Sequence, residues 1–537
     1  MSAAPTVSAR TGLDRFEGAA LAAFAVVSVA ILAPLLTRGR PLSGADGFYP
    51  ADQLQYMAWI REAAHHVTIG NRFDLAPGGR PFLHPGFLLS GLVQRVTGVS
   101  VPLALLLWKP VAVLLSFWGA LAYVRRLLPA GGRRRAALVI ALFSVMPASA
   151  IVAWTVGGST QSSYTFDFIS GEMWAGQYLW GYLMTAIAVG LMPLVLLAVE
   201  RHRGEGAMRP LWLAAAGALV VTWLQPWQGA TLAVIVVATE AVRYARTRTR
   251  PPLRLALVPA AVALPGIYYA VLGWADDSWR LASEANAAGS QPQWQWPWWA
   301  IVLTVLPLAA PAILAYRLPA RGWQGVAVRV WPLAALVVFL GPGITFPYHA
   351  FQGLALPLGV LAVEGVAARW HPRPAIVVAA LALLTLPGLA HKLERGASNV
   401  HAGADPYFIF PGDHRALDFL EHDPRPGGVL ARSYAGFYVP YTTGRETWVG
   451  ALSWSPHFLL RKGLAEDAVA LRVPPARVRA IVRASRARFV YSDCAAHRQL
   501  APALGPLLQS AHHFGCARVY VLRPTPAMAR AAGPPDA

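Results

Sequence analysis

The sequence predicts an all-α polytopic membrane protein with a C-terminal α/β domain, and two features indicate this class. Of the 537 residues, 56% are hydrophobic and only 13% are charged, with a mean hydropathy of +0.44. Apolar runs near or above the ~18 residues of a spanning helix recur as far as residue 390 and then stop. Strand-like and helical runs alternate beyond that point, which is typical of a small α/β domain.

About eleven membrane spans are predicted within residues 16–390. The first apolar run is too long and too poorly flanked for a cleaved signal peptide, so it is interpreted as an anchor. The predicted spans are about 16–37, 101–124, 136–154, 177–200, 211–224, 228–245, 255–273, 298–316, 330–342, 353–368 and 375–390.

Arginine distribution sets the orientation. Five arginines lie between positions 125 and 135, whereas 155–176, 225–227 and 343–352 contain no Lys or Arg. Because basic residues favour cytoplasmic loops, residues 1–15 are predicted to be cytoplasmic and the C-terminal domain extracytoplasmic. Keeping the arginine cluster inside requires residues 82–97 to form an outer surface helix, within a first outer loop of 38–100. These clusters also account for much of the net charge of +20, which argues against nucleic-acid binding.

The stretch 44–67 carries the first candidate site. From Asp52 onward it has a helical pattern with two faces, which predicts a helix on the membrane surface with Arg61 snorkelling. Asp52 is interpreted either as an N-cap, with Gln55 completing a capping box, or as a catalytic carboxylate. Asp46 lies in a Gly-rich turn and is either a turn former or a second catalytic acid. The predicted polar face contains Asp52, Gln55, Trp59, Glu62 and His66, of which the last two are expected to be solvated; the apolar face contains Leu54, Met57, Ile60, Ala64 and Val67.

Two pairs of short spans meet at bends, LQPWQG near 225 and GPGITFPYHAFQG near 349. Irregular backbone at membrane depth needs protein or a water-filled cavity around it, so both bends are predicted to line one outward-facing cavity. Polar side chains there are either functional or satisfy the bent backbone. These side chains are Gln225, Gln228, His349 and Gln352.

Other candidate ligand-binding residues lie near the predicted outer surface. Asp167 and Glu172 are the only charged residues of 155–176, which suits a polar ligand or a cation, although an ordinary surface loop would look the same. Lys109 either snorkels to the interface or meets a lipid phosphate. Nucleotide-binding and HExxH motifs are absent, and no CxxC pair occurs, so no metal-ligand spacing is visible.

Residues 391–524 are predicted to form the α/β domain, followed by a disordered tail over 525–537. Cys494 and Cys516 are the only cysteines, and a disulfide or two free thiols would both fit. The aromatic run 434–454 suits sugar stacking or core packing. Strands are predicted at 427–433, 446–452, 488–493 and 517–522, and helices at 414–423, 475–485 and 497–510.

The segment Asp52-Gln-Leu-Gln-Tyr56 resembles the Asp-Glu-x-x-Tyr motif of the GT-C superfamily of integral-membrane glycosyltransferases, including protein O-mannosyltransferases and aminoarabinose transferases. Arg80-Pro-Phe-Leu-His84-Pro85 resembles the Pro-rich element that follows in those proteins. The resemblance implies transfer of a sugar from a polyprenyl-phosphate donor to a glycan, lipid or protein acceptor at the outer face. Asp52 would be the general base of an inverting transfer, with Asp46 as the other catalytic candidate. No organic cofactor is implied, whereas a divalent cation stays open. The implied substrate-binding residues are Tyr56, Arg80, His84, Lys109, Asp167, Glu172, His349 and Gln352.

Two other functions fit the same sequence. Gln53 stands where the second acid of the motif usually lies, so a catalytically inactive relative that serves in assembly or binding is one alternative. Broken helices with polar groups at membrane depth also occur in transporters of lipids or glycans. A large first outer loop with an acidic helix favours chemistry at the surface over alternating access.

Overall fold

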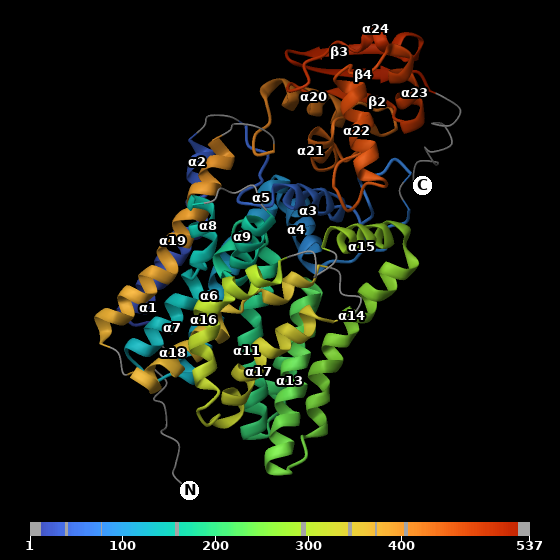
Figure 1. Ribbon diagram of the computed structural model, residues 1–537. Coiled ribbons are helices and arrows are strands. Elements are labelled where there is room, and N and C mark those ends of the chain that lie inside the picture. The colour runs from blue at the N-terminus through green and yellow to red at the C-terminus, as the bar shows by residue number, and fades with distance from the viewer. Residues whose placement is uncertain are drawn as a thin grey trace.

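The computed structural model describes residues 12–37, 41–76, 78–155, 161–290, 297–341, 346–370, 373–401 and 406–524. Most of the predicted cytoplasmic N-terminus and the predicted disordered tail therefore lie outside the described residues. Within them, a long bundle of helices carries a smaller domain at one end, and a short helix lies crosswise between the two parts (Figure 1).

Every predicted span is found as a helix, some of them broken. Among the described residues, five helices are long and apolar enough to cross a membrane, or six if the bent pair α7–α8 is one span. This is therefore a multi-pass membrane protein whose eleven predicted spans are not confirmed. The bundle contains α1 (Arg15–Ala30), α2 (Leu32–Leu36), α5 (Val101–Leu106), α6 (Trp108–Leu127), α7 (Gly132–Phe143), α8 (Pro147–Thr155), α11 (Leu183–Glu205), α12 (Met208–Leu224), α13 (Pro226–Thr247), α14 (Leu257–Ala275), α16 (Trp298–Ala315), α17 (Gly322–Phe339), α18 (Ala355–Trp370) and α19 (Pro374–His401).

Close packing of α6 against α11 depends on two glycines. A Cβ atom on Gly119 would meet the Gly190 carbonyl oxygen at 2.0 Å, and one on Gly190 would meet the Leu115 carbonyl carbon at 2.6 Å. Backbones can approach this closely only where side chains are absent, and such small-residue contacts are typical of helix packing in membranes. The centre of the bundle is therefore held by backbone shape as well as by apolar side chains.

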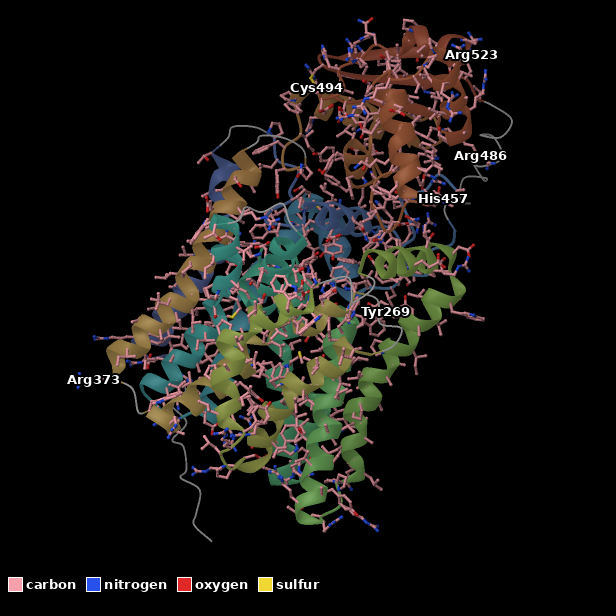
Figure 2. The ribbon with its side chains drawn as sticks, in the orientation of Figure 1. Tyr269, Arg373, His457, Arg486, Cys494 and Arg523 are labelled. Carbon is pink, nitrogen blue, oxygen red and sulfur yellow. A yellow bond between two sulfur atoms is a disulfide. The ribbon has the colours of Figure 1, made fainter. Side chains whose placement is uncertain are left out.

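The predicted inner loops gather at the end of the bundle away from the C-terminal domain. Arg126 binds Glu200 at 2.7 Å, and Arg203 binds Glu240 at 2.8 Å, so loops far apart in sequence lie together. Arg373 lies at the same end (Figure 2). The arginine-rich loops thus share one side of the bundle, as predicted.

Several segments predicted as loops are helical. Residues 155–176 contain α9 (Gln161–Met173) and α10 (Ala175–Tyr178), and residues 275–297 contain α15 (Asp277–Ser290). The second bend contains η2 (Pro347–Phe351), and η1 (Leu253–Ala256) precedes α14. These helices were not predicted because their polar composition does not give the long apolar runs of a membrane span. They contact other helices of the protein rather than lipid.

The crosswise helix α3 (Pro50–Ala63) is not the predicted surface helix with one face in lipid. It packs against α4 (Pro85–Thr97) below and α21 (Ser433–Thr443) above, and most of its residues on both faces are buried. Arg61 does not snorkel, because its guanidinium binds Glu421 at 2.6 Å and the Thr442 carbonyl at 2.8 Å. The C-terminal domain therefore contacts both predicted faces of α3, at Arg61 through Thr442 and at Trp59 through Trp454.

The C-terminal domain has a four-stranded sheet in the order β1-β2-β4-β3. β1 (Val429–Leu430) pairs parallel with β2 (Phe489–Ser492), and β4 (Ala517–Leu522) pairs antiparallel with β2 and with β3 (Leu508–Phe514). The helices are α20 (Pro411–His422), α21, α22 (Phe458–Val469), α23 (Pro475–Ser485) and α24 (Ala501–Leu504), followed by η3 (Gly505–Leu507).

Two secondary-structure predictions about this domain were wrong. Residues 446–452 are not a strand, since only an isolated bridge joins Thr447 to Val429. The helix expected over 497–510 ends early and turns into β3, which pairs with β4. The domain boundary expected at 391 falls inside α19, which continues to His401. Cys494 and Cys516 are joined as a disulfide; Cys494 is labelled in Figure 2.

Candidate active site

Asp52 lies in the first turn of α3 but does not cap the helix. The cap residue is Tyr49, which makes no side-chain cap bond, and Pro50 begins the helix. The hydroxyl of Tyr182 instead donates a hydrogen bond to Asp52 Oδ2 at 2.5 Å. Burial raises the pKa of Asp52, and the Tyr182 hydrogen bond and nearby His349 oppose the rise. A carboxylate with a raised pKa is a stronger base than an exposed one.

Aromatic rings surround this carboxylate. Tyr49 stacks on Tyr182 with ring centroids 4.5 Å apart, and its hydroxyl accepts a hydrogen bond from Gln177. Tyr56, one turn beyond Asp52, packs on Phe87 at 5.2 Å. Asp52 is therefore held in a low-polarity setting with a fixed side-chain direction.

Asp46 is a structural partner of Lys109. The two side chains are buried and joined at 2.7 Å, and Lys109 also donates to the Ser28 carbonyl at 3.1 Å. The Gln53 amide accepts from the Asp46 backbone N–H at 2.9 Å and donates to the Asp46 carbonyl. Asp46 is thus neither a simple turn former nor a free carboxylate, and Lys109 does not face lipid.

The two bends of the bundle meet, as predicted. Gln225 donates to Gln352 Oε1 at 2.8 Å, and Gln228 donates to the His349 carbonyl at 2.7 Å. The Nδ1 atom of His349 lies 3.1 Å from a Glu172 oxygen and 2.9 Å from the Gln352 amide nitrogen. Since His349 acts electrostatically on Asp52, the polar groups of the bends belong to the same region as the first outer loop.

Asp167 is not the uncompensated acid that its loop suggested. Lys392 binds it at 2.7 Å, His391 lies 3.6 Å away, and Arg395 forms a further ion pair. Although burial opposes ionisation, these groups hold the pKa of Asp167 below its usual range. Asp167 therefore ties α9 to α19, a contact that its own loop could not reveal.

Arg80 and His84 have structural roles rather than a role at Asp52. Arg80 donates to Glu62 at 2.8 Å, so Glu62 is a buried ion-pair partner rather than a solvated residue. His84 caps α4 by accepting from the Phe87 N–H at 3.3 Å. Burial lowers the pKa of His84 to about 3, so it is neutral and offers no positive charge to a phosphate.

A cation site is not formed around Asp52 by the residues described. Within them, the His and carboxylate groups that could share one ion are Asp418, Glu421 and His422, which are exposed on α20. Glu421 is already paired with Arg61, so this group of side chains is read as surface charge. The side chains that act on Asp52 are Tyr182, His349 and Tyr56.

Sequence reasoning missed Tyr49, Tyr182 and Lys392. The tyrosines lie in runs rich in aromatic residues, and that density was the only signal. The aromatic run 434–454 packs largely as core: Phe437, Tyr438, Tyr441 and Trp454 are buried, and Trp454 meets Trp59 at 5.2 Å.

The fold is similar to those of several solved glycosyltransferases. No family model and no curated protein matches the chain. Among solved structures, the Archaeoglobus fulgidus oligosaccharyltransferase in complex with Zn and sulfate is similar, with 14% identity, a TM-score of 0.50, and coverage of 88% of this chain and 68% of that one.

Two further structures have the same fold. One is the oligosaccharyltransferase AglB from Archaeoglobus fulgidus in complex with an inhibitory peptide and a dolichol-phosphate, with 12% identity, a TM-score of 0.50, and coverage of 91% and 71%. The other is the mycobacterial arabinofuranosyltransferase AftD, with 14% identity, a TM-score of 0.51, and coverage of 96% of this chain and 40% of that one.

Proposed function

We propose that this protein transfers a sugar from a polyprenyl-phosphate donor to a hydroxyl group of a glycan, lipid or protein acceptor at the outer face of the membrane. One observation carries the proposal: Asp52 is a carboxylate with a raised pKa, fixed by Tyr182 at the start of a buried helix. The same fold holds a dolichol-phosphate in AglB, which supports a lipid-phosphate donor.

Asp52 acts as the general base. It takes the proton of the acceptor hydroxyl while that oxygen attacks the anomeric carbon of the sugar. The bond between the anomeric carbon and the phosphate oxygen breaks on the opposite side, so the configuration is inverted and the lipid phosphate leaves with the bonding electrons. Such a leaving group needs charge stabilisation more than protonation.

His349 is the residue we assign to the leaving phosphate. The Gln352 amide can donate to its Nδ1 atom at 2.9 Å, and in that tautomer the ring hydrogen lies on Nε2, which can donate to the phosphate. Lys109, Arg80 and His84 are withdrawn from this role, because the first two are paired with acids and His84 is neutral. Gln352 becomes a positioning residue for the imidazole, and Glu172 lies beside the same ring nitrogen.

Gln53 does not argue for an inactive relative. Its amide hydrogen-bonds both backbone groups of Asp46 and so shapes the turn before α3. Position 53 therefore has a structural task, and the carboxylate at position 52 is left to the chemistry.

Release of the lipid phosphate tests the function. Purified protein is incubated with labelled polyprenyl-phosphate mannose, arabinose and aminoarabinose, with and without crude acceptor glycans, and the free lipid phosphate is measured. We expect release from one of these donors, and loss of release in Asp52→Asn. Intact, folded protein that releases phosphate from none of them would favour an assembly or binding role.

A further inference from the structure

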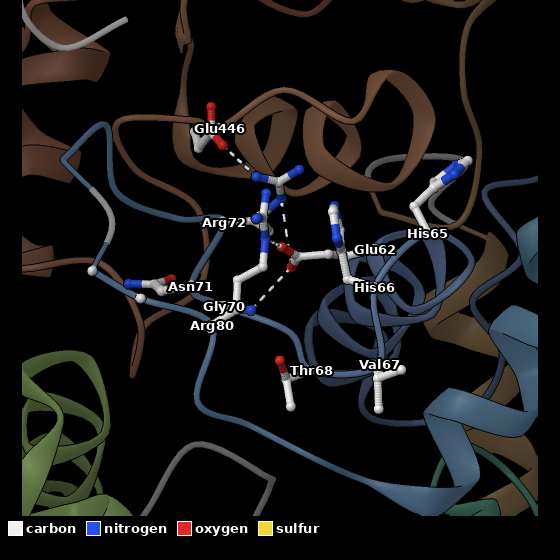
Figure 3. Close-up of a pocket in the computed structure, with 12 residues that line it drawn as sticks. Glu62, His65, His66, Val67, Thr68, Gly70, Asn71, Arg72, Arg80 and Glu446 are labelled. Atoms are coloured by element: carbon white, nitrogen blue, oxygen red, sulfur yellow. Dashed lines mark hydrogen bonds and ion pairs between the residues drawn. The ribbon is translucent and has the colours of Figure 1, made fainter. Parts of the chain in front are cut away.

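A cavity of about 600 Å³ lies at the far end of α3, between the first outer loop and the C-terminal domain (Figure 3). It is separate from the Asp52 site: ten residues of helix at ~1.5 Å each place Glu62 about 15 Å along α3 from Asp52. Its lining residues are Glu62, His65, His66, Val67, Thr68, Gly70, Asn71, Arg72, Gly78, Gly79, Arg80 and Glu446.

The charges of this cavity cancel. Glu62 is buried beneath it and binds Arg80 at 2.8 Å, with Arg72 at 3.7 Å. Arg72 also binds Glu446 from the C-terminal domain, as the dashed lines of Figure 3 show. Two arginines thus face two glutamates. Burial and the neighbouring Arg80 lower the pKa of His66, so its imidazole adds no charge at neutral pH. A polyanion would find no net positive charge here.

Hydrogen-bonding groups are nevertheless plentiful. The Nε atom of Arg80 binds Glu62, while its terminal nitrogens have no hydrogen-bond partner among the described residues. The ring nitrogens of His65 and His66 and the Thr68 hydroxyl likewise lack hydrogen-bond partners in the described part of the chain. Val67 contributes the one aliphatic side chain to the lining. A polar, charge-balanced cavity of this kind matches a ligand rich in hydroxyl groups.

One wall of the cavity is formed by glycine backbone without side chains. Gly78 and Gly79 line the cavity, and a Cβ atom on Gly79 would meet nothing within 4 Å. The wall is held in place because Ile69 and Phe82 pair as a backbone bridge on either side of it. A ligand can therefore approach the backbone here without any side chain moving.

We infer that this cavity binds an uncharged, hydroxyl-rich saccharide, the distal part of a glycan acceptor whose reacting end lies at Asp52. The identification of this saccharide as an acceptor rests on the proposed function, but saccharide binding can be measured without sugar transfer. Its ligand class follows from the paired charges and the free donors. The closing of the cavity by Glu446 makes the C-terminal domain part of the acceptor site.

Binding is measured on the full-length protein in nanodiscs by saturation-transfer NMR and calorimetry. The probes are short uncharged mannose and arabinose oligosaccharides and, for contrast, uronic-acid oligosaccharides. Gly79→Phe adds a ring at the cavity wall, where an added Cβ atom meets nothing within 4 Å. Gly463→Phe on α22 is the matched control, because Gly463 also has nothing within 4 Å of an added Cβ and is no part of the cavity lining.

We expect an uncharged oligosaccharide to bind, and Gly79→Phe to weaken that binding at least about tenfold while Gly463→Phe does not. Arg80→Gln is expected to weaken it too, because it removes the free donors. Unchanged binding in Gly79→Phe, preference for the uronic acids, or no saccharide binding by a folded protein would each overturn the inference. Asp52→Asn should bind the saccharide normally. Saccharide binding without sugar transfer by the wild-type protein would overturn only the proposed reaction. Sugar transfer without saccharide binding would overturn only this inference.

Discussion

The Tyr182 hydroxyl lies 2.5 Å from Asp52 Oδ2, although the two residues are 130 positions apart in the chain. The contact joins the first turn of α3 to the segment just before α11. It fixes one carboxylate oxygen and leaves the other for an acceptor. Because the tyrosine hydroxyl donates a hydrogen bond, it stabilises the ionised form of the carboxylate, which is the form that a general base requires.

Asp52→Asn is expected to lower the transfer rate by roughly 10²-fold or more, because an amide cannot accept the acceptor's proton. The melting temperature should change little, since Asp52 is not the helix cap and Asn can still accept from Tyr182. Transfer rate and melting are measured on the same preparation. Near-normal turnover with a normal melt would exclude Asp52 as the base.

Tyr182→Phe tests how the base is tuned. Removing the hydroxyl removes an interaction that lowers the pKa of Asp52, so that pKa should rise further. The base must be ionised, so the acidic limb of the pH–rate profile should move to higher pH. Tyr441→Phe is the control, because it deletes a buried tyrosine bond to the Ser43 carbonyl instead. If the acidic limb of the pH–rate profile does not move in Tyr182→Phe, that limb does not report the ionisation of Asp52.

Lys109→Met is expected to destabilise the protein by about 3–5 kcal/mol, because it leaves Asp46 buried without its cation. The double variant with Asp46→Asn should recover much of this loss, as the unpaired charge is then removed. Chemical denaturation in detergent measures both. A stable Lys109→Met with only a raised KM for the donor would mean that Lys109 binds the lipid phosphate after all.

The Cys494–Cys516 disulfide closes a separation of 22 residues and should stabilise the outer domain by about 3 kcal/mol by loop-closure entropy. Thiol labelling of unreduced, denatured protein is expected to modify neither cysteine, and labelling after reduction should modify both. Two labelled cysteines before reduction would show free thiols and place this domain outside an oxidising compartment.

Reporter fusions test the orientation. Since the arginine-rich loops share one end of the bundle, fusions at Gly131 and Gly206 should report the cytoplasm. Fusions at Gly289 and Ala511 should report the outside. An external signal at Gly131 would reverse the bundle and place the candidate active site on the cytoplasmic face.

Helix positions in the bundle followed from hydropathy because a lipid-facing backbone must satisfy its own hydrogen bonds over long apolar runs. The number of spans could not be predicted from hydropathy in the same way. The helices α12 and α18 and the bent pair α7–α8 are short, and protein covers their polar ends. Charge clustering located the ends that lie together, since loop arginines pair with acids of neighbouring loops.

The site was only partly predictable. Periodicity marked two faces of α3, but what covers them comes from residues such as Trp454, far along the chain. Lys109, Asp46 and Asp167 were singled out as candidate site residues, but their ion-pair partners could not be predicted from the local sequence pattern. Ion pairs between distant segments depend on the finished fold.

The continuation of α19 to His401 has a consequence for protein engineering. A chimera joined at residue 391, where the composition changes, would cut a helix and remove Lys392 and Arg395 from Asp167. Exchange of the outer domain between related proteins would also uncover Trp59 and leave Glu62 without Arg72's link to Glu446. The C-terminal domain is therefore not an interchangeable module. Under the proposed function, acceptor preference is better re-engineered by point substitutions along α3 and its flanking loop.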